Sequence, residues 1–192
     1  MKKFFMTLAA VAMAATMNAQ GYIGGGVGFE SSSSDGNSDT YFMIQPEVGY
    51  NLSDNLAVGV MIGYGENKLT LKDAHGNKVS GKVKAFTINP YLRYTFAKFD
   101  KVNLFLDGGI SYTNTKETAS AVGGEDVKNN TFGIGIKPGV AVNLTDKLTF
   151  VSHFGFIGYE NSKDDYEGAK AVNTFGAKID ATSLSFGLYY NF

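Results

Sequence analysis

The sequence predicts an all-β protein: an eight-stranded antiparallel up-and-down transmembrane β-barrel, preceded by a cleavable signal peptide. A nine-residue unit with alternating apolar and polar residues occurs four times, around positions 46, 90, 138 and 186. A period of this size indicates a repeated structural unit. The alternating stretches run 9 to 11 residues, and a tilted strand needs about 9–11 residues to cross a bilayer.

The first segment has the features of a secretory signal peptide. Lys2 and Lys3 precede an apolar run from Phe4 to Met17, and Ala19 ends a small-residue cleavage site. The run is shorter than the about 20 residues that a spanning helix needs. The predicted domains are therefore a signal peptide over residues 1–19 and an outer-membrane β-barrel domain over residues 20–192.

The composition agrees with this class. The chain has no Cys, 24 Gly, 15 Phe and 11 Tyr, which excludes disulfides and thiolate metal sites and suits strands. The net charge is −1, and it becomes −3 once Lys2 and Lys3 are removed. Nothing in this balance indicates nucleic acid as a partner.

The strands follow in order along the chain. The first begins near Gly21, and residues 31–39 read as a loop. The four repeat copies, at residues 44–52, 88–96, 136–144 and 184–192, supply every second strand. The strands between them cover residues 56–65, 103–112 and 148–157, with the apolar residues at even positions. In the last of these, Phe156 is expected to face outward and Ile157 inward.

The connections and the strand ends predict how the barrel sits. Connections are short at residues 53–55, 97–101 and 145–147 and long elsewhere, so the short turns and both termini are expected in the periplasm. Beyond Tyr64 the outward positions become Glu66 and Lys68, as in a strand that leaves a bilayer. Residues 184–192 must pair with the first strand, because an unpaired edge in lipid costs several kcal/mol.

Prolines interrupt three of the repeat copies. Pro46, Pro90 and Pro138 lie in mid-strand on the lipid-facing side, and each removes one ladder donor. Their common depth predicts bulges or bends there. The sequence identifies no donor for the carbonyl groups that face them.

Taken together, the mature chain resembles the small eight-stranded outer-membrane barrels of Gram-negative bacteria, namely the OmpX-like proteins and the membrane domain of OmpA, also called outer membrane β-barrel or porin family proteins. The signal peptide, the four hairpins, the alternating connections and the final Tyr190-Asn191-Phe192 carry this resemblance, which covers residues 20–192. The resemblance implies that Tyr190 and Phe192 are part of a signal read by the barrel-assembly machinery. It does not imply anchoring to the cell wall, because no second domain is expected after the barrel.

Five inward-facing polar residues are candidates for a network in the lumen: Glu47, Arg93, Asp107, Lys137 and His153. One interpretation is a closed, charge-balanced core, which the narrow interior of an eight-stranded barrel favours. The alternative is a narrow ion path lined by the same side chains.

Catalysis is not predicted. Ser152 and His153 point to opposite faces of their strand, so no nucleophile and base can act together. No cofactor or metal is expected, and the run Asp164-Asp165-Tyr166-Glu167 reads as a solvated acidic loop rather than a cation site.

A group of lysines lies just outside the predicted bilayer: Lys68, Lys72, Lys82 and Lys84. They could meet lipopolysaccharide phosphates, or they could form the solvated face of a projecting hairpin.

The predicted function is that of a monomeric integral outer-membrane protein with a structural or surface-interaction role. Its partners would be outer-membrane lipid and lipopolysaccharide, the assembly machinery, and a host or envelope surface partner at the long loops. One alternative is a small porin-like pore. Another is a soluble lipocalin-like barrel, which would require an apolar lumen and a polar exterior.

Overall fold

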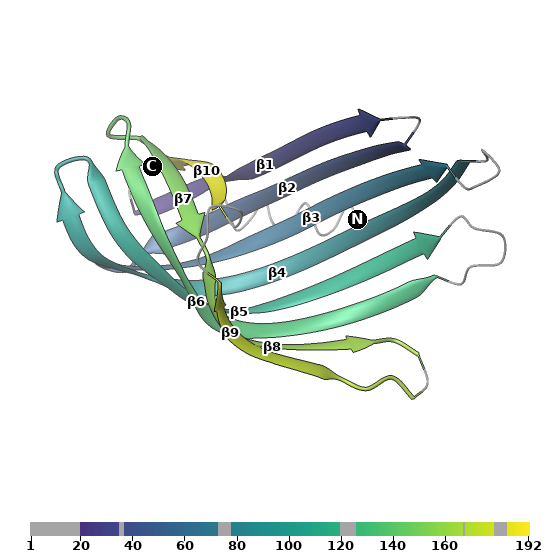
Figure 1. The fold of residues 1–192 in the computed structure, drawn as a ribbon. Helices are drawn as coiled ribbons and strands as arrows, with labels where there is room; N and C mark the ends of the chain where they lie inside the picture. Colours follow the sequence, from purple (N-terminus) through teal and green to yellow (C-terminus); the bar gives the residue numbers. More distant parts are fainter. Residues whose placement is uncertain (1–19, 35–36, 73–77, 120–125, 167, 179–183) are drawn as a thin grey trace, which may run out of the picture.

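The computed structural model describes residues 20–34, 37–72, 78–119, 126–166, 168–178 and 184–192, so the predicted signal peptide lies outside it. These residues form strands only (Figure 1). The strands are β1 (Gly21–Ser34), β2 (Asn37–Asn51), β3 (Leu56–Lys72), β4 (Lys78–Phe99), β5 (Val102–Ala119), β6 (Val127–Asn143), β7 (Leu148–Phe154), β8 (Phe156–Asp164), β9 (Val172–Lys178) and β10 (Leu184–Asn191). Within the described ranges, no helix has the length and hydropathy to cross a membrane.

Within the described ranges, the strands close into an eight-stranded antiparallel barrel, as predicted. Strands β1 to β6 pair consecutively, and β6 then pairs with both β7 and β8, which together make the seventh barrel strand. Strands β9 and β10 make the eighth. Closure comes from β10, which pairs with β1 from Tyr22↔Asn191 to Gly25↔Leu188.

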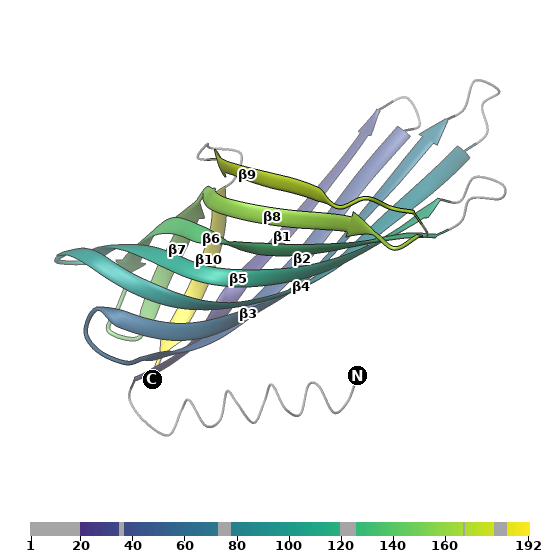
Figure 2. The same cartoon turned by 90° about the horizontal axis from the view of Figure 1, so that it is seen from below.

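The two ends of the barrel differ. The turns β2–β3, β4–β5 and β6–β7 and the C-terminus lie at one end, here called the turn end (Figures 1 and 2). The hairpins β1–β2, β3–β4, β5–β6 and β8–β9 project from the other, the loop end. The predicted loop over residues 31–39 is wrong in most of its length, because β1 runs to Ser34 and β2 starts at Asn37. The long ladder of cross-strand hydrogen bonds continues beyond the bilayer-spanning segment.

The seventh barrel strand is not the uniform strand that was predicted. Gly155, with φ 92°, separates β7 from β8. Pairing with β6 moves from Gly139↔His153 to Ile136↔Ile157, which is three steps on β6 and four on its partner. The extra residue inverts the alternation: Ile157 is exposed on the outside, whereas the Phe156 ring lies inside. This positive φ favours glycine.

The prolines mark interruptions in the ladder. Pairing of β2 with β3 omits Gln45 and Pro46, and pairing of β4 with β5 omits Asn89 and Pro90. The register is the same on both sides of these two sites, so they are not bulges. The predicted bulge is present only opposite Pro138, at Gly155.

The carbonyl group that lies opposite Pro90 on β5 accepts a hydrogen bond that the sequence did not predict. The register places Pro90 opposite Ile110. The Asn89 side chain donates from Nδ2 to the Ile110 carbonyl oxygen at 2.6 Å. This amide replaces the backbone N–H that proline lacks.

The two faces of the wall are the reverse of those of a soluble barrel. Leu92, Ile134 and Phe186 are exposed on the outside, whereas Glu47, Arg93 and Asp107 are buried in the lumen. An exposed apolar band over a polar interior is the pattern of a transmembrane barrel, and it contradicts the lipocalin alternative.

Candidate functional site

The centre of the lumen holds a buried ion pair. Strand pairing sets Arg93 of β4 directly opposite Asp107 of β5. The guanidinium donates from Nε to Asp107 Oδ1 at 2.8 Å and from Nη2 to Oδ2 at 2.7 Å. Both side chains are buried. A two-point contact of this kind fixes the geometry as well as the charge balance.

Tyrosines join a second carboxylate to this pair. Glu47 accepts hydrogen bonds from the Tyr91 hydroxyl and, at 2.6 Å, from the Tyr189 hydroxyl. Its Oε1 lies 3.5 Å from Arg93 Nη2. Tyr22 and Tyr91 share a hydrogen bond of 2.6 Å between their hydroxyls. The group therefore ties β1, β2, β4, β5 and β10 together across the lumen.

Aromatic rings surround the guanidinium. The Arg93 Cζ atom lies 4.2 Å from the Phe105 ring centroid, and the rings of Tyr91, Tyr189 and Tyr22 follow at 5.2, 5.4 and 5.8 Å. Cation–π contacts at these distances are favourable when the cation is desolvated. We call Glu47, Arg93, Asp107 and these four aromatic residues the lumen cluster.

Of the five residues predicted to form a lumen network, the structure brings four into hydrogen-bond contact: Glu47, Arg93, Asp107 and His153. His153 Nε2 lies 2.8 Å from Asp107 Oδ2. Lys137, in contrast, donates to Asn89 Oδ1 at 3.3 Å and pairs with no carboxylate within 4.0 Å in the described part of the chain. Both Asp107 oxygens already bond to Arg93, and one of them also bonds to His153. The tyrosines were not predicted as members, although their inward positions were visible in the sequence.

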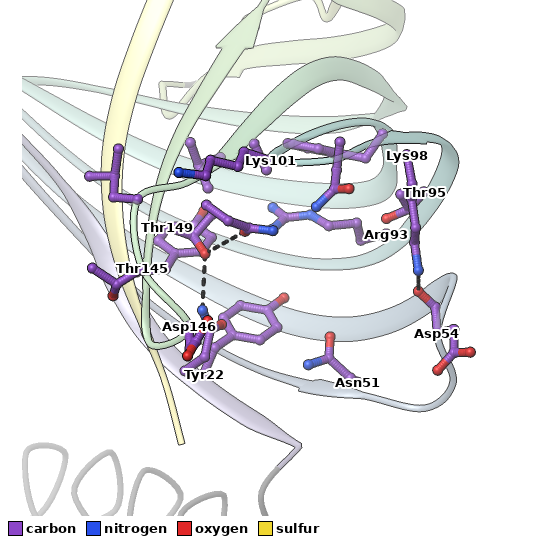
Figure 3. Close-up of a pocket in the computed structure, with 18 of the residues that line it drawn as sticks. Tyr22, Asn51, Asp54, Arg93, Thr95, Lys98, Lys101, Thr145, Asp146 and Thr149 are labelled. Atoms are coloured by element: carbon purple, nitrogen blue, oxygen red, sulfur yellow. Dashed lines mark hydrogen bonds between the residues drawn. The ribbon is translucent and has the colours of Figure 1, made fainter.

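A cavity of about 860 Å³ opens at the turn end and reaches the lumen cluster (Figure 3). Its lining includes Arg93 but not Glu47, Asp107 or His153, so the cluster forms its closed end. The wall carries amide side chains from four strands: Asn51, Asn103, Asn143 and Asn191. Among the described residues, every buried side-chain nitrogen and oxygen has a hydrogen-bond partner. The buried polar side chains of the lumen are therefore paired at this depth.

The outer face at the loop end carries a row of lysines. Lys84, Lys116 and Lys128 are direct neighbours across β4, β5 and β6, and we call them the lysine row. Of the predicted group, Lys68 and Lys82 pair one step further out, whereas the Lys72 side chain lies outside the described part of the structure. The sequence analysis missed Lys116 and Lys128, although both occupy even, outward positions.

Two carboxylates neutralise part of this surface. Glu66 pairs with Lys82 at 2.7 Å, and Asp126 pairs with Lys116 at 2.6 Å. These hydrogen bonds from lysine lower the pKa of both carboxyl groups. Lys84 and Lys128 have no carboxylate within 4.0 Å among the described residues. Lys84 does lie directly opposite Glu66, and both row lysines act electrostatically on these carboxylates. The lysine row together with Lys68 and Lys82 therefore carries more positive charge than these two carboxylates offset.

The whole chain matches one family model. Residues 4–192 match the outer membrane protein beta-barrel domain. The chain belongs to this family. It is thus a β-barrel protein of the bacterial outer membrane. None of the curated protein sequences matches it significantly.

Solved structures agree with this outer-membrane barrel in fold. Neisserial surface protein A is 20% identical, with a TM-score of 0.50 over 91% of this chain and 98% of that one. OprG from Pseudomonas aeruginosa is 13% identical, with a TM-score of 0.57 over 90% and 96%. A major outer membrane protein from Thermus thermophilus is 14% identical, with a TM-score of 0.51 over 90% and 98%. At these identities the likeness concerns the fold alone.

The end of the barrel chain packs at the turn end. The Phe192 backbone N–H donates to the Gly21 carbonyl at 3.1 Å, and the Tyr190 and Phe192 rings meet edge to face with centroids 5.2 Å apart. In the described residues there is no group of three potential metal ligands, and His153 bonds to Asp107 rather than to a nucleophile.

Proposed function

We propose that this outer-membrane barrel has a structural and surface-interaction role, and that its lysine row binds lipopolysaccharide phosphates. It acts as a non-enzymatic monomer, with the turn end in the periplasm and the loop-end hairpins available to host or envelope partners. Tyr190 and Phe192 serve as the signal for the assembly machinery. The observation that carries the proposal is the row Lys84–Lys116–Lys128 on the outer wall, in which lysines lie directly opposite lysines on neighbouring strands.

The position of the row supports a lipid partner. Ile88 and Ile110 are exposed on the outer face of the same strands, four and six residues closer to the turn end than Lys84 and Lys116. Along this outer face the side chains change from apolar to cationic toward the loop end, as a bilayer changes from acyl chains to headgroups. The short turns at the opposite end support a periplasmic turn end.

Electrostatics supports an anionic partner. Like charges directly opposite each other on neighbouring strands are destabilising. A phosphate seated between the lysines would relieve this repulsion, and a cation near an anionic leaflet contributes about 1 kcal/mol. The row is therefore better explained by a bound anion than by water alone.

The triple variant Lys84→Gln/Lys116→Gln/Lys128→Gln tests the proposal. Its matched control changes three lysines at the turn end: Lys98, Lys101 and Lys147 to Gln. Binding of lipid A-bearing glycolipid is measured with each barrel in phosphatidylethanolamine nanodiscs at two salt concentrations. We expect the row variant to bind at least tenfold more weakly at low salt, with the control unchanged. Equal affinity in both variants would refute the lysine row as the phosphate site.

The orientation has its own test, since the chain has no Cys. Single substitutions Asp126→Cys at the loop end and Asp146→Cys at the turn end are exposed to a membrane-impermeant maleimide on intact cells. Labelling only at position 126 is expected. Labelling only at position 146 would invert the proposed orientation.

A second candidate is a small pore, which the cavity of about 860 Å³ favours because its lining runs from the turn end to Arg93. A pore would require the hydrogen bonds of the lumen cluster to break, so that a continuous path opens through the lumen. Stepwise conductance of the purified barrel in planar bilayers, with altered selectivity in Arg93→Ala or Glu47→Ala, would support this candidate. Silent bilayers would remove it.

A further inference from the structure

A second cavity lies at the loop end, where β5, β6 and β8 meet, and its volume is about 300 Å³. Its lining combines aromatic, amide and charged side chains: Tyr112, Asn130, Phe132, Asn161, Lys163, Asp164, Asp165 and Tyr166. Tyr112 and Phe132 occupy even, outward positions and are exposed. This cavity therefore opens on the outer wall and is distinct from the lumen. We call it the outer cavity.

The inverted alternation after Gly155 builds one side of the outer cavity. The register sets Asn161 opposite Phe132 and Lys163 opposite Asn130. Because Phe132 faces outward, its direct neighbour Asn161 also faces outward. Without the extra residue, Asn161 and Lys163 would point into the lumen. The residue inserted at Gly155 thus determines that Asn161 and Lys163 of β8 face outward.

Hydrogen bonds orient the two amides of the cavity in opposite senses. Asn130 Oδ1 accepts from the Tyr112 hydroxyl and from Asn114 Nδ2, both at 2.8 Å, so its Nδ2 is directed away as a donor. Asn161 Nδ2 donates to Asn173 Oδ1 at 2.6 Å, which keeps its Oδ1 as an acceptor. The register makes the two amides diagonal neighbours, which lie about 7–8 Å apart. A donor and an acceptor at that spacing suit a ring with several hydroxyl groups, each of which can donate or accept.

Charge and exposure narrow the ligand class. Lys163 is balanced by Asp165 in the lining, and the Asp164 carboxylate accepts a hydrogen bond from Asn129 on the inward face. The cavity therefore offers no net positive charge to a bare phosphate. Phe132 and Tyr166 are 45% and 62% exposed, so apolar ring surface is available to a partner. A hydroxyl-bearing ring with an apolar face fits both features. The volume is at the lower end of the about 300–1,000 Å³ of ligand pockets, which suits one sugar ring.

We propose that the outer cavity binds a pyranose ring in the saccharide headgroup of an outer-leaflet glycolipid. This rests on the proposed function, because the same lipid would place its phosphates on the lysine row. Lys116 and Lys128 lie two residues beyond Asn114 and Asn130 on the same outer face. Tyr112 in the lining pairs with the exposed Ile88 of the outer apolar band. The cavity therefore borders that band, as a headgroup site would.

The test compares Phe132→Ala and Tyr166→Ala with Phe42→Ala. Phe42 is 44% exposed on β2, so it matches Phe132 in type and exposure but lies outside the cavity. Nanodiscs of phosphatidylethanolamine contain one of three probes: phosphorylated lipid A-type glycolipid, its dephosphorylated form, or phosphatidylglycerol. The bound lipid per barrel is measured by native mass spectrometry. The shift in gel mobility on heating checks that each variant is folded.

Each cavity variant is expected to bind both glycolipids roughly two- to tenfold more weakly, in line with the loss of one aromatic contact, while Phe42→Ala leaves binding unchanged. The lysine-row variant should weaken only the phosphorylated form. Equal losses in Phe132→Ala and Phe42→Ala, or binding of phosphatidylglycerol as tight as that of glycolipid, would overturn the cavity proposal and leave the lysine row standing. Equally tight binding of the free, lipid-less disaccharide would overturn the assignment to a lipid.

Discussion

The lumen cluster and the outer cavity use the same kinds of side chain on opposite faces of one wall. In the lumen, Tyr22, Tyr91 and Tyr189 are buried, and their hydroxyls bond to each other or to Glu47. In the outer cavity, Tyr112 and Tyr166 are exposed. The difference shows that residue type alone does not determine what a tyrosine does in this barrel. Buried tyrosines that hydrogen-bond to one another or to Glu47 stabilise the barrel wall. Exposed tyrosines keep ring surface that a ligand can contact.

The largest loss of stability is expected when the cation of the lumen cluster is removed. Arg93→Leu leaves Glu47 and Asp107 buried with their charges uncompensated. We expect a loss of about 3–5 kcal/mol in unfolding free energy, measured by urea titration of the barrel in lipid. Lys101→Leu, at an exposed turn position, is the control and should change little. A loss below about 1 kcal/mol for Arg93→Leu would mean that the lumen cluster does not stabilise the folded barrel.

A smaller loss of stability, which a second substitution should partly restore, is expected at the Asn89 amide. Asn89→Leu removes the donor to the Ile110 carbonyl, and an unsatisfied buried acceptor costs about 1–3 kcal/mol. Adding Pro90→Ala restores a backbone N–H opposite Ile110 and should recover at least half of the loss in the same urea titration. If the double variant is no more stable than Asn89→Leu alone, the amide does not substitute for the missing ladder bond.

Sequence alternation predicted which residues meet in the lumen but not which of them bond. Parity placed Glu47, Arg93, Asp107 and His153 on one face, and closure of the barrel brought them together. Lys137 shares that face, yet its contact with Asn89 depends on the depth that each side chain reaches, which alternation does not encode.

The sequence carries only part of the signal for Gly155. The apolar residues keep even positions through Phe156 and take odd positions from Ile157 to Tyr159, which indicates an inserted residue nearby. Only the strand pairing shows that Gly155 is the inserted residue. The lysine row likewise depends on register between hairpins, which fixes the heights of Lys84, Lys116 and Lys128 relative to one another.

A still smaller effect is expected at the inserted glycine. Gly155→Ala forces a Cβ into a positive-φ conformation, at a cost of about 1–2 kcal/mol. Gly108→Ala is the matched control, since a Cβ there would meet no atom within 4 Å. If the outer cavity depends on this glycine, Gly155→Ala should also weaken glycolipid binding. Equal unfolding curves for the two variants would contradict the strained position.

An effect of similar size on the folded barrel is expected at the last residue. Deleting Phe192 removes one backbone hydrogen bond to Gly21 and one ring contact with Tyr190, worth about 1–2 kcal/mol together. Assembly in cells should fall by more than this, because the residue is also predicted to be an assembly signal. Outer-membrane levels of the truncated chain are compared with those of Phe192→Tyr, which keeps an aromatic end. Normal levels of the truncation would remove the signal role.

The proline interruptions have a mechanical consequence. The ladders within hairpins, β1–β2, β3–β4 and β5–β6, run without a break, while those that join one hairpin to the next omit two residues at each proline. The missing bonds therefore lie at three of the seams between hairpins. Each hairpin is continuous, whereas its attachment to the next hairpin is weakened in mid-strand. When the bilayer thickness or lateral pressure changes, we expect the wall to bend at these three seams more readily than within the hairpins.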